Sequence, residues 1–320
     1  MMESVLLKMV EPETAGDPMS EQKWVRSSLR SLSERLGRVG HAVSAPTISR
    51  VLKAHGYSLR VNAKEKDPRS QHRDRDTQFR SIATQMAAFS ARGAPIISVD
   101  TKKKELIGNF KNAGSSWSQE AQAVNVHDFL SDATGRASPY GIYDVQRNAG
   151  GVYVGLSADT PEFAVKAISR WWSDHGQVGY RGMAELLILA DSGGSNGCRP
   201  RLWKEQVQSQ LSDVLGLTIT VCHYPTGCSK WHPIEHRLFS QISRNWVGQP
   251  LRTVETMLGW IRGTTTRTGL RVWAHLLEGL FEIGKKVSDA VMKTLNVTRH
   301  GICPQWNYTI YPRPSDGSAP

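Results

Sequence analysis

The chain has 320 residues, 39% of them apolar, with 40 Lys and Arg against 29 Asp and Glu and a formal net charge of +11. This length suits roughly two domains, and the apolar share, ten Trp and a mean hydropathy of −0.40 exclude a largely disordered chain and a membrane protein. Four scattered Cys without a C-x-x-C pair, and an amino terminus without a basic segment before its short apolar stretch, predict a reducing, cytoplasmic location.

The basic surplus is concentrated near the amino terminus. Residues 20–80 carry 14 basic and 6 acidic side chains, whereas residues 1–19 carry one Lys against four acids. Such a segment is typical of a protein that binds a polyanion, and the lack of a long amphipathic helix favours nucleic acid over a membrane. A solvated basic surface is the alternative that charge alone leaves open.

Two short helices joined by a Gly-containing turn are predicted within residues 1–60. The first spans 23–37, and the second begins after the N-cap Ser44 and ends before Gly56. This pattern predicts a small all-α helix-turn-helix domain, whose second helix enters the major groove of DNA. Its exposed early residues would face bases or phosphates: Thr47, Ser49, Arg50 and Lys53. A helical hairpin without a role in DNA binding is the alternative.

The pattern changes along the rest of the chain. Residues 61–93 are predicted to form a basic linker and a helix, with helical periodicity over 79–89. Five strands are predicted from apolar runs at 95–100, 138–145, 150–157, 185–191 and 217–224. Helices are predicted to begin near Pro161, Arg201 and Pro233. An antiparallel meander followed by alternating helices and strands is the order of a ribonuclease-H-like α/β domain, with a mixed five-stranded sheet and flanking helices over residues 94–250.

Three acidic residues stand at element ends that converge in such a domain. Asp100 ends the first strand, Asp191 ends the fourth, and Glu235 lies in the first turn of the last helix. Clustered carboxylates repel one another, so the arrangement is favourable only when divalent cations occupy it. Two cations roughly 3.5–4 Å apart can flank one phosphodiester, and Mg²⁺ prefers oxygen ligands. We therefore predict that these residues are catalytic and bind two Mg²⁺ ions, for which Mn²⁺ can substitute.

Basic residues flank the three acids. Lys102, Lys103 and Lys104 follow Asp100 directly, and we expect them to contact phosphates. Lys230 and Arg237 lie on either side of Glu235 and are predicted to hold DNA ends, with a solvated surface as the alternative. Trp231 lies beside a turn, where it can stack on a flipped base.

Other side chains favour simpler interpretations. Cys228, His232 and His236 contain the ligand types of zinc, but their spacing is loose and no second knuckle accompanies them. The pair His127 and Asp128 occurs once, without partner histidines, so we interpret it as a local turn. Asp144 lies in a strand and is interpreted as structural rather than as a fourth acid near the metals.

Long strings of the chain carry a family resemblance. They include SVDTKKKELIGNFKN (98–112), EFAVKAISRWW (162–172), LADSGGSNG (189–197), TVCHYPTGCSKWHPIEHRLFS (220–240) and WNYTI (306–310). In this order they resemble the DDE transposases of the ISAzo-thirteen insertion-sequence family, from about Val10 to Pro312. The resemblance implies a ribonuclease-H-like core whose DDE triad falls on Asp100, Asp191 and Glu235.

The chain departs from this family at a few places. Ser192 stands where the family usually has Gly, and CSKWHPIEHR stands where it usually has TSKWNKIEHR. The family usually has a further helix-turn-helix segment before the EPET string at residues 11–14, so we expect this copy to be shortened at its amino terminus. Residues 251–312 are expected to form a C-terminal helical extension, and residues 313–320 a disordered tail.

The resemblance implies a DNA transposase that binds its element ends, hydrolyses phosphodiesters and transfers the 3′-OH strand into target DNA. Its expected partners are the terminal repeats, the target DNA and a second copy in a dimer or larger synaptic complex, associated with a bacterial nucleoid. Two alternatives stay open. A ribonuclease-H-like nuclease that cuts without joining uses the same acids, and a catalytically silent DNA-binding remnant would follow from the missing segment.

Overall fold

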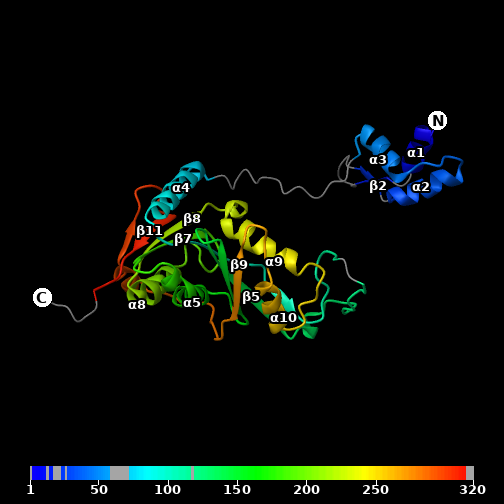
Figure 1. Cartoon of the computed structure of the whole chain (residues 1–320). Helices are drawn as coiled ribbons and strands as arrows, with labels where there is room; N and C mark the ends of the chain where they lie inside the picture. Colours follow the sequence, from blue (N-terminus) through cyan, green and yellow to red (C-terminus); the bar gives the residue numbers. More distant parts are fainter. Residues whose placement is uncertain are drawn as a thin grey trace. The chain divides into compact units, whose positions relative to one another are not determined.

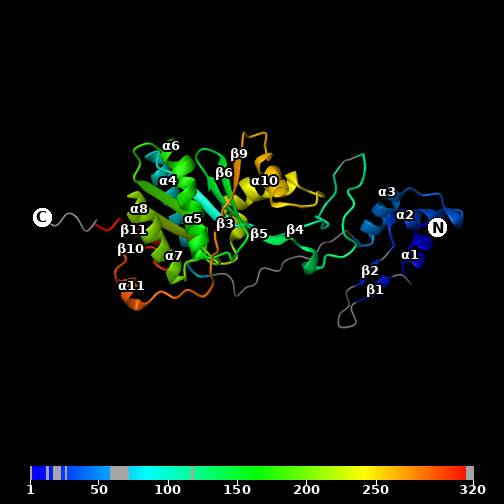
Figure 2. The same ribbon diagram turned by 90° about the horizontal axis from the view of Figure 1, so that it is seen from below.

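The computed structural model describes residues 2–11, 14–16, 23–25, 27–57, 72–116 and 119–314. The chain divides into two compact units, Met1–Lys66 and Asp67–Pro320, which are drawn in Figures 1 and 2. Residues 61–71, the first part of the predicted basic linker, lie outside the described residues. Within the described ranges, no helix has the length and apolar character needed to cross a membrane.

The described residues of the first unit form three helices and a small sheet. The helices are α1 (Met2–Val10), α2 (Leu29–Arg38) and α3 (Ala45–Ala54), and β1 (Thr14–Gly16) pairs antiparallel with β2 (Lys23–Val25). A small apolar core joins the helices: Leu6, Val10, Leu32, Leu36, Ile48 and Leu52. The prediction for α3 is confirmed, with Ser44 at its N-cap.

Two predictions for this unit are wrong. The first helix of the pair begins at Leu29 rather than at residue 23, because Lys23–Val25 pair with Thr14–Gly16 as a strand. Ser28 then caps the helix, and its hydroxyl accepts a hydrogen bond from the Ser31 amide at 3.1 Å. The unit is therefore not all-α.

A mixed sheet forms the centre of the second unit. Its central strands are β3 (Ile96–Thr101), β5 (Gly135–Asp144), β6 (Ala149–Gly155), β7 (Glu185–Asp191) and β8 (Thr218–Tyr224). In the order β6-β5-β3-β7-β8, β5 is antiparallel to both neighbours, while β7 and β8 run parallel to β3. These are the five predicted strands in a ribonuclease-H-like arrangement, so the predicted fold class is confirmed.

The sheet is nevertheless larger than predicted, with nine strands rather than five. On one edge β9 (Arg271–Leu276) runs parallel to β6, and on the other β11 (Asn307–Ile310) pairs with β8 and then with β10 (Val297–Arg299). The remaining strand, β4 (Glu105–Ile107), pairs with β5. The expected helical extension over 251–312 thus contributes three strands besides α10 (Val254–Arg262) and α11 (Asp289–Lys293). These strands cover edges that a five-stranded sheet would leave open.

Helices cover both faces of this sheet, as Figure 1 shows. One face packs against α5 (Pro161–Trp171), α7 (Arg201–Gln206) and α8 (Asp213–Leu215), with Trp171 and Trp203 buried in its core. The other packs against α4 (Arg75–Ala91) and α9 (Ser240–Asn245), with Trp246 buried. Single π-helical turns interrupt or precede these helices at Trp172–Gly176, Val207–Ser212 and Glu235–Phe239, and the first leads into α6 (Gln177–Gly179).

Two glycines let the π-turn Glu235–Phe239 lie close to the sheet. A Cβ atom on Gly141 of β5 would lie 2.5 Å from the Phe239 ring and 2.9 Å from Ile234. A Cβ atom on Gly150 of β6 would lie 2.4 Å from Leu238. Larger side chains on these strands would therefore push away the turn that carries Glu235.

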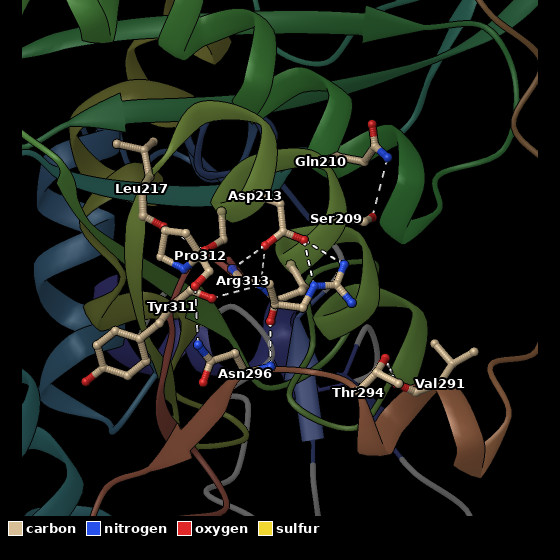
Figure 3. Close-up of polar contacts among 12 residues, drawn as sticks. Ser209, Gln210, Asp213, Leu217, Val291, Thr294, Asn296, Tyr311, Pro312 and Arg313 are labelled. Atoms are coloured by element: carbon tan, nitrogen blue, oxygen red, sulfur yellow. Dashed lines mark hydrogen bonds and ion pairs between the residues drawn. The ribbon is translucent and has the colours of Figure 1, made fainter. Parts of the chain in front are cut away.

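The last described residues are anchored to α8 (Figure 3). The Arg313 guanidinium donates to Asp213 Oδ2 at 2.6 and 2.9 Å, and the Arg313 amide donates to Oδ1 at 2.9 Å. Burial opposes the charge of Asp213, but these hydrogen bonds lower its pKa below the ordinary value. Of the expected disordered tail, Arg313 is thus held in place, and residues 315–320 lie outside the described residues.

Candidate active site

The two catalytic aspartates predicted from sequence lie side by side. Asp100 is near the end of β3 and Asp191 ends β7, and the parallel register that pairs Val99 with Ala190 brings them to the same edge of the sheet. The Thr101 amide donates to Asp100 Oδ1 at 2.8 Å, which orients that carboxylate. Both side chains are only partly exposed.

Glu235 is positioned by the start of its helix. The buried hydroxyl of Ser98 on β3 accepts a hydrogen bond from the Ile234 amide at 3.1 Å, and the Glu235 amide donates to the His232 carbonyl at 3.1 Å. The π-turn that follows is a geometry that proteins often use at functional sites. The predicted helix from Pro233 is confirmed, and its first turn is tied to the strand that carries Asp100.

His232 lies between the acids, which the sequence did not predict. Its Nδ1 is 3.3 Å from Asp191 Oδ1 and 3.9 Å from Asp100 Oδ2, and the side chain is completely buried. Its Nε2 lies 3.0 Å from the Leu189 carbonyl. A carbonyl can only accept, so Nε2 carries the proton, and in the neutral ring the Nδ1 lone pair faces the carboxylates.

This arrangement fits a bound cation. Asp191 Oδ1 and His232 Nδ1 are buried without a hydrogen-bond partner in the described parts of the chain, and a lone pair facing carboxylate oxygens is repulsive. One ligand atom each from Asp100, Asp191 and His232 lies within 4.8 Å of the others. A divalent cation here would satisfy all three, and the hydrogen bond from Nε2 to a carbonyl is the usual support of a metal-bound histidine. Glu235 lies outside this cluster.

The site disfavours negative charge when it holds no cation. Burial raises the pKa of Asp100 from 3.8 to about 7, and the negative charge of Asp191 adds to this effect. Burial and the same aspartate also raise the pKa of Glu235. Glu235 in turn raises the pKa of Asp100, so it lies within electrostatic range of the pair. Positive charge is what such a group of acids requires.

A buried row of hydrogen bonds fixes the end of β7. Trp203 Nε1 donates to the Tyr308 hydroxyl at 2.8 Å, the hydroxyl lies 3.2 Å from His223 Nε2, and His223 Nδ1 lies 2.9 Å from the Asp191 carbonyl. The carbonyl can only accept, so Nδ1 carries a proton, and in the neutral ring Nε2 accepts from the Tyr308 hydroxyl. Burial lowers the pKa of His223 to about 4. The row thus links β11 and α7 to the backbone that presents Asp191.

The predicted DNA contacts differ in their exposure. Lys103, Lys104, Lys230 and Arg237 are exposed, as are Arg50 and Lys53 on α3, while Thr47 and Ser49 are half-buried. Lys102 is instead engaged within the protein, because its Nζ lies 2.6 Å from Glu105 Oε1 and 4.7 Å from the Trp246 ring centre. Its side chain is only 11% exposed, which argues against a direct phosphate contact.

In the described part of the chain, the other candidate metal ligands of the sequence do not come together as a site. Cys228, His232 and His236 do not form a metal-compatible group among the described residues, and neither do His127 and Asp128. Asp144 is the last residue of β5 and caps the turn that follows. It accepts hydrogen bonds from the Tyr180 hydroxyl at 2.7 Å and from two backbone amides. The structural interpretation of Asp144 is therefore supported.

Trp231 remains 43% exposed beside the site. Its ring is contacted by the Arg75 guanidinium at 4.8 Å and by Lys230 Nζ at 4.5 Å. Both cations lie over the ring, so the stacking of a base on Trp231 stays a prediction.

A cavity of about 600 Å³ lies near the loop that follows Asp191. Its lining includes Thr160 at the N-cap of α5, Ser195, Arg201 and Lys286. The hydroxyl of Ser195 is buried and has no hydrogen-bond partner among the described residues. Asp159, another lining residue, accepts a hydrogen bond at 3.2 Å from Thr101, next to Asp100.

A family model described as the Rhodopirellula transposase DDE domain matches residues 5–312. Among solved structures, the chain is similar to a Mos1 transposase paired-end complex with the left transposon end, at 14% identity and a TM-score of 0.42, covering 81% of this chain and 69% of that one. The chain is also similar to the Mos1 strand transfer complex, at 15% identity and a TM-score of 0.42, covering 81% of this chain and 68% of that one. A third similar structure is a mariner Mos1 paired-end complex with Mg, at 15% identity and a TM-score of 0.46, covering 81% of this chain and 69% of that one. No curated protein sequence matches the chain.

Proposed function

Because the chain belongs to the family of Rhodopirellula transposase DDE domains, we propose that it binds the ends of its own DNA element, cuts the phosphodiester there and joins the freed 3′ hydroxyl to target DNA. The observation that supports this most is the cluster of Asp100, Asp191 and His232 with Glu235 beside it. The cluster contains two of the acids that the family resemblance assigns to the DDE triad. Its residues are far apart along the chain and are brought together by the fold.

The site residues have distinct roles in this proposal. Asp100 and Asp191 would hold divalent cations together with His232 Nδ1, and Glu235 would complete the site from the opposing helix. Cations bound there would activate the attacking oxygen and stabilise the leaving one. The Leu189 carbonyl fixes the proton of His232 on Nε2, and the Ser98 hydroxyl fixes the helix start that carries Glu235.

DNA would be held by cationic groups outside the metal ligands. Lys103, Lys104, Lys230 and Arg237 are exposed around the acids and would bind phosphates. Residues of α3 in the first unit, above all the exposed Arg50 and Lys53, would bind the element ends through a major groove. Joining two ends requires at least two such chains, so a synaptic dimer or larger assembly is part of the proposal.

A cleavage and joining assay tests this function. Labelled DNA carrying the gene's own flanks is incubated with the full chain and Mg²⁺ or Mn²⁺, with EDTA as a control. We expect joined products that require metal and disappear in Asp191→Asn. The matched control is Asp128→Asn, because Asp128 is an exposed acid outside the metal-compatible group, and it should leave the products unchanged.

Other outcomes would identify the alternatives. Cleavage without joining would indicate a nuclease of the same fold. DNA that is bound but neither cut nor joined would indicate a silent remnant. Joined products that persist in Asp191→Asn would contradict the assignment of the site.

A further inference from the structure

A second group of metal-compatible side chains lies at the β9 edge of the sheet. Asp174 and His175 belong to the π-turn Trp172–Gly176 that extends α5, and His275 belongs to β9. One ligand atom from each lies within 4.8 Å of the others. None of the three is among the residues of the site described above, and β9 lies three strands from β3 in the sheet.

Aromatic contacts fix both imidazole rings. His175 stacks on Trp273 with ring centres 4.1 Å apart, and His275 stacks on Tyr153 with ring centres 5.8 Å apart. Trp273 and His275 are two residues apart on β9 and therefore share the face covered by α5 and its π-turn. The rings are thus oriented before any ligand arrives, which lowers the entropic cost of binding one.

One ring nitrogen in this group lacks a partner. His175 Nε2 is buried and makes no hydrogen bond within the described part of the chain. Leaving a buried polar atom unsatisfied is unfavourable, because the atom has lost its hydration without gaining a hydrogen bond. The hydroxyl of Tyr153, the ring beneath His275, is also buried without a partner there. A ligand in this space would remove at least the first of these penalties.

The charges around the group are compatible with a cation. Asp174 Oδ2 accepts from Arg170 Nε at 2.7 Å, which leaves the other carboxylate oxygen for a second partner. Burial lowers the pKa of both His175 and His275, which favours the neutral rings that bind metals. The negative charge of Asp174 raises the pKa of both rings and is the charge that favours a cation here. Arg147 near His175 and Arg262 near His275 act in the opposite direction, so the carboxylate is essential to the group.

We propose that Asp174, His175 and His275 form a second metal site, which takes Zn²⁺ or a similar borderline divalent ion with water in the fourth position. Two imidazoles and one carboxylate favour such ions, whereas Mg²⁺ prefers oxygen ligands. Ligands about 2.0–2.1 Å from Zn²⁺ lie about 3.3 Å apart in a tetrahedron, so the side chains close slightly around the ion. The bound ion ties the edge strand β9 to the helix that covers it.

The test measures zinc bound by the full chain without contributions from the catalytic cluster. The background is the variant Asp191→Asn/His232→Asn, stripped of metal and then dialysed against low Zn²⁺. We expect about one Zn²⁺ per chain by mass spectrometry of the metal content, and a rise in the thermal midpoint. Adding His275→Gln or His175→Gln should remove both effects. His127→Gln is the matched control, because His127 is an exposed histidine on a loop, and it should remove neither.

A second readout covers variants that fail to fold. Asp174→Asn changes a ligand at the surface, and circular dichroism establishes whether its fold is kept. Bound Co²⁺ should give tetrahedral visible bands in the background variant, and Asp174→Asn should weaken them. Zinc content and Co²⁺ bands that are the same in the background, Asp174→Asn and His275→Gln would overturn the proposal. So would the absence of bound zinc in the background variant itself.

Discussion

At the residue scale, the nitrogen of His232 should set the metal preference of the active site. Its Nδ1 lies 3.3 Å from Asp191 Oδ1, and a nitrogen ligand there disfavours Mg²⁺, which prefers oxygen ligands, relative to a transition ion such as Mn²⁺. His232→Asn introduces the side chain that the resembled family usually carries at this position. We expect Mn²⁺ binding to weaken by about tenfold or more, with Mg²⁺ binding affected less. Calorimetric titration of both ions measures the ratio, and an unchanged ratio would show that Nδ1 is not a ligand.

His223 predicts a pH dependence of stability. Burial holds its folded-state pKa at about 4, below the ordinary 6.5, so folding favours the neutral ring. The stability it contributes is complete above pH 6.5 and is lost as the pH falls towards 4, with a magnitude on the order of 3 kcal/mol. His223→Gln cannot titrate and should flatten this part of the profile. Urea unfolding of metal-free protein at pH 7.5 and 4.5 checks it, and parallel profiles for the two proteins would refute it.

The proximity of Asp100 and Asp191 could be predicted from sequence, whereas that of their neighbour His232 could not. Asp100 and Asp191 each follow a buried apolar run, and strand ends of this kind converge in the fold. In the sequence, His232 is spaced only loosely from Cys228 and His236, and this spacing did not indicate a metal site. The available signal was its position three residues before Glu235, at the start of the same helix. Its tautomer depends on the Leu189 carbonyl, a contact across 43 residues that no local pattern reveals.

At the scale of elements, the packing of the π-turn on β5 leads to a third prediction. Gly141→Ala places a methyl group 2.5 Å from the Phe239 ring, so the turn that begins with Glu235 must move. We expect a loss of about 1–3 kcal/mol in the free energy of unfolding, together with reduced metal-dependent cleavage. Gly135→Ala is the control on the same strand, because its Cβ meets nothing within 4 Å. Equal effects of the two changes would contradict this account.

The five central strands were predicted within a few residues because their apolar runs are strong. The strands at the sheet edges were not predicted, because their apolar runs are weak. The β9 sequence RVWAHL has exposed residues at both ends, and β10 and β11 are short. β9 and β11 become strands by pairing with β6 and β8, which are far away in sequence, and β10 then pairs with β11. The prediction of a helix from residue 23 was wrong for a similar reason. Lys23–Val25 form a strand by pairing with Thr14–Gly16, despite the helical periodicity of this segment.

At the scale of the whole molecule, the two units have separate cores, so their contributions to DNA binding can be separated. Arg50 and Lys53 are exposed on α3. Replacing both with Ala should reduce the magnitude of the slope of log K against log salt by about 2. The metal-induced thermal shift of the second unit should be unchanged. Lys293→Ala removes an exposed charge on α11 and is the control. Salt titrations by fluorescence anisotropy measure the slope, and identical slopes would place the DNA contacts elsewhere.

The order in which the strands occur along the chain matters during translation. β6 ends at Gly155 and β8 at Tyr224, but their outer partners begin only at Arg271 and Asn307. At about 5–20 residues per second, β6 waits on the order of ten seconds on the ribosome with its outer backbone groups unpaired. Unpaired edges recruit other chains. A stop codon before Arg271 would leave both edges open permanently, so such a product should aggregate even though Asp100, Asp191 and Glu235 are all present.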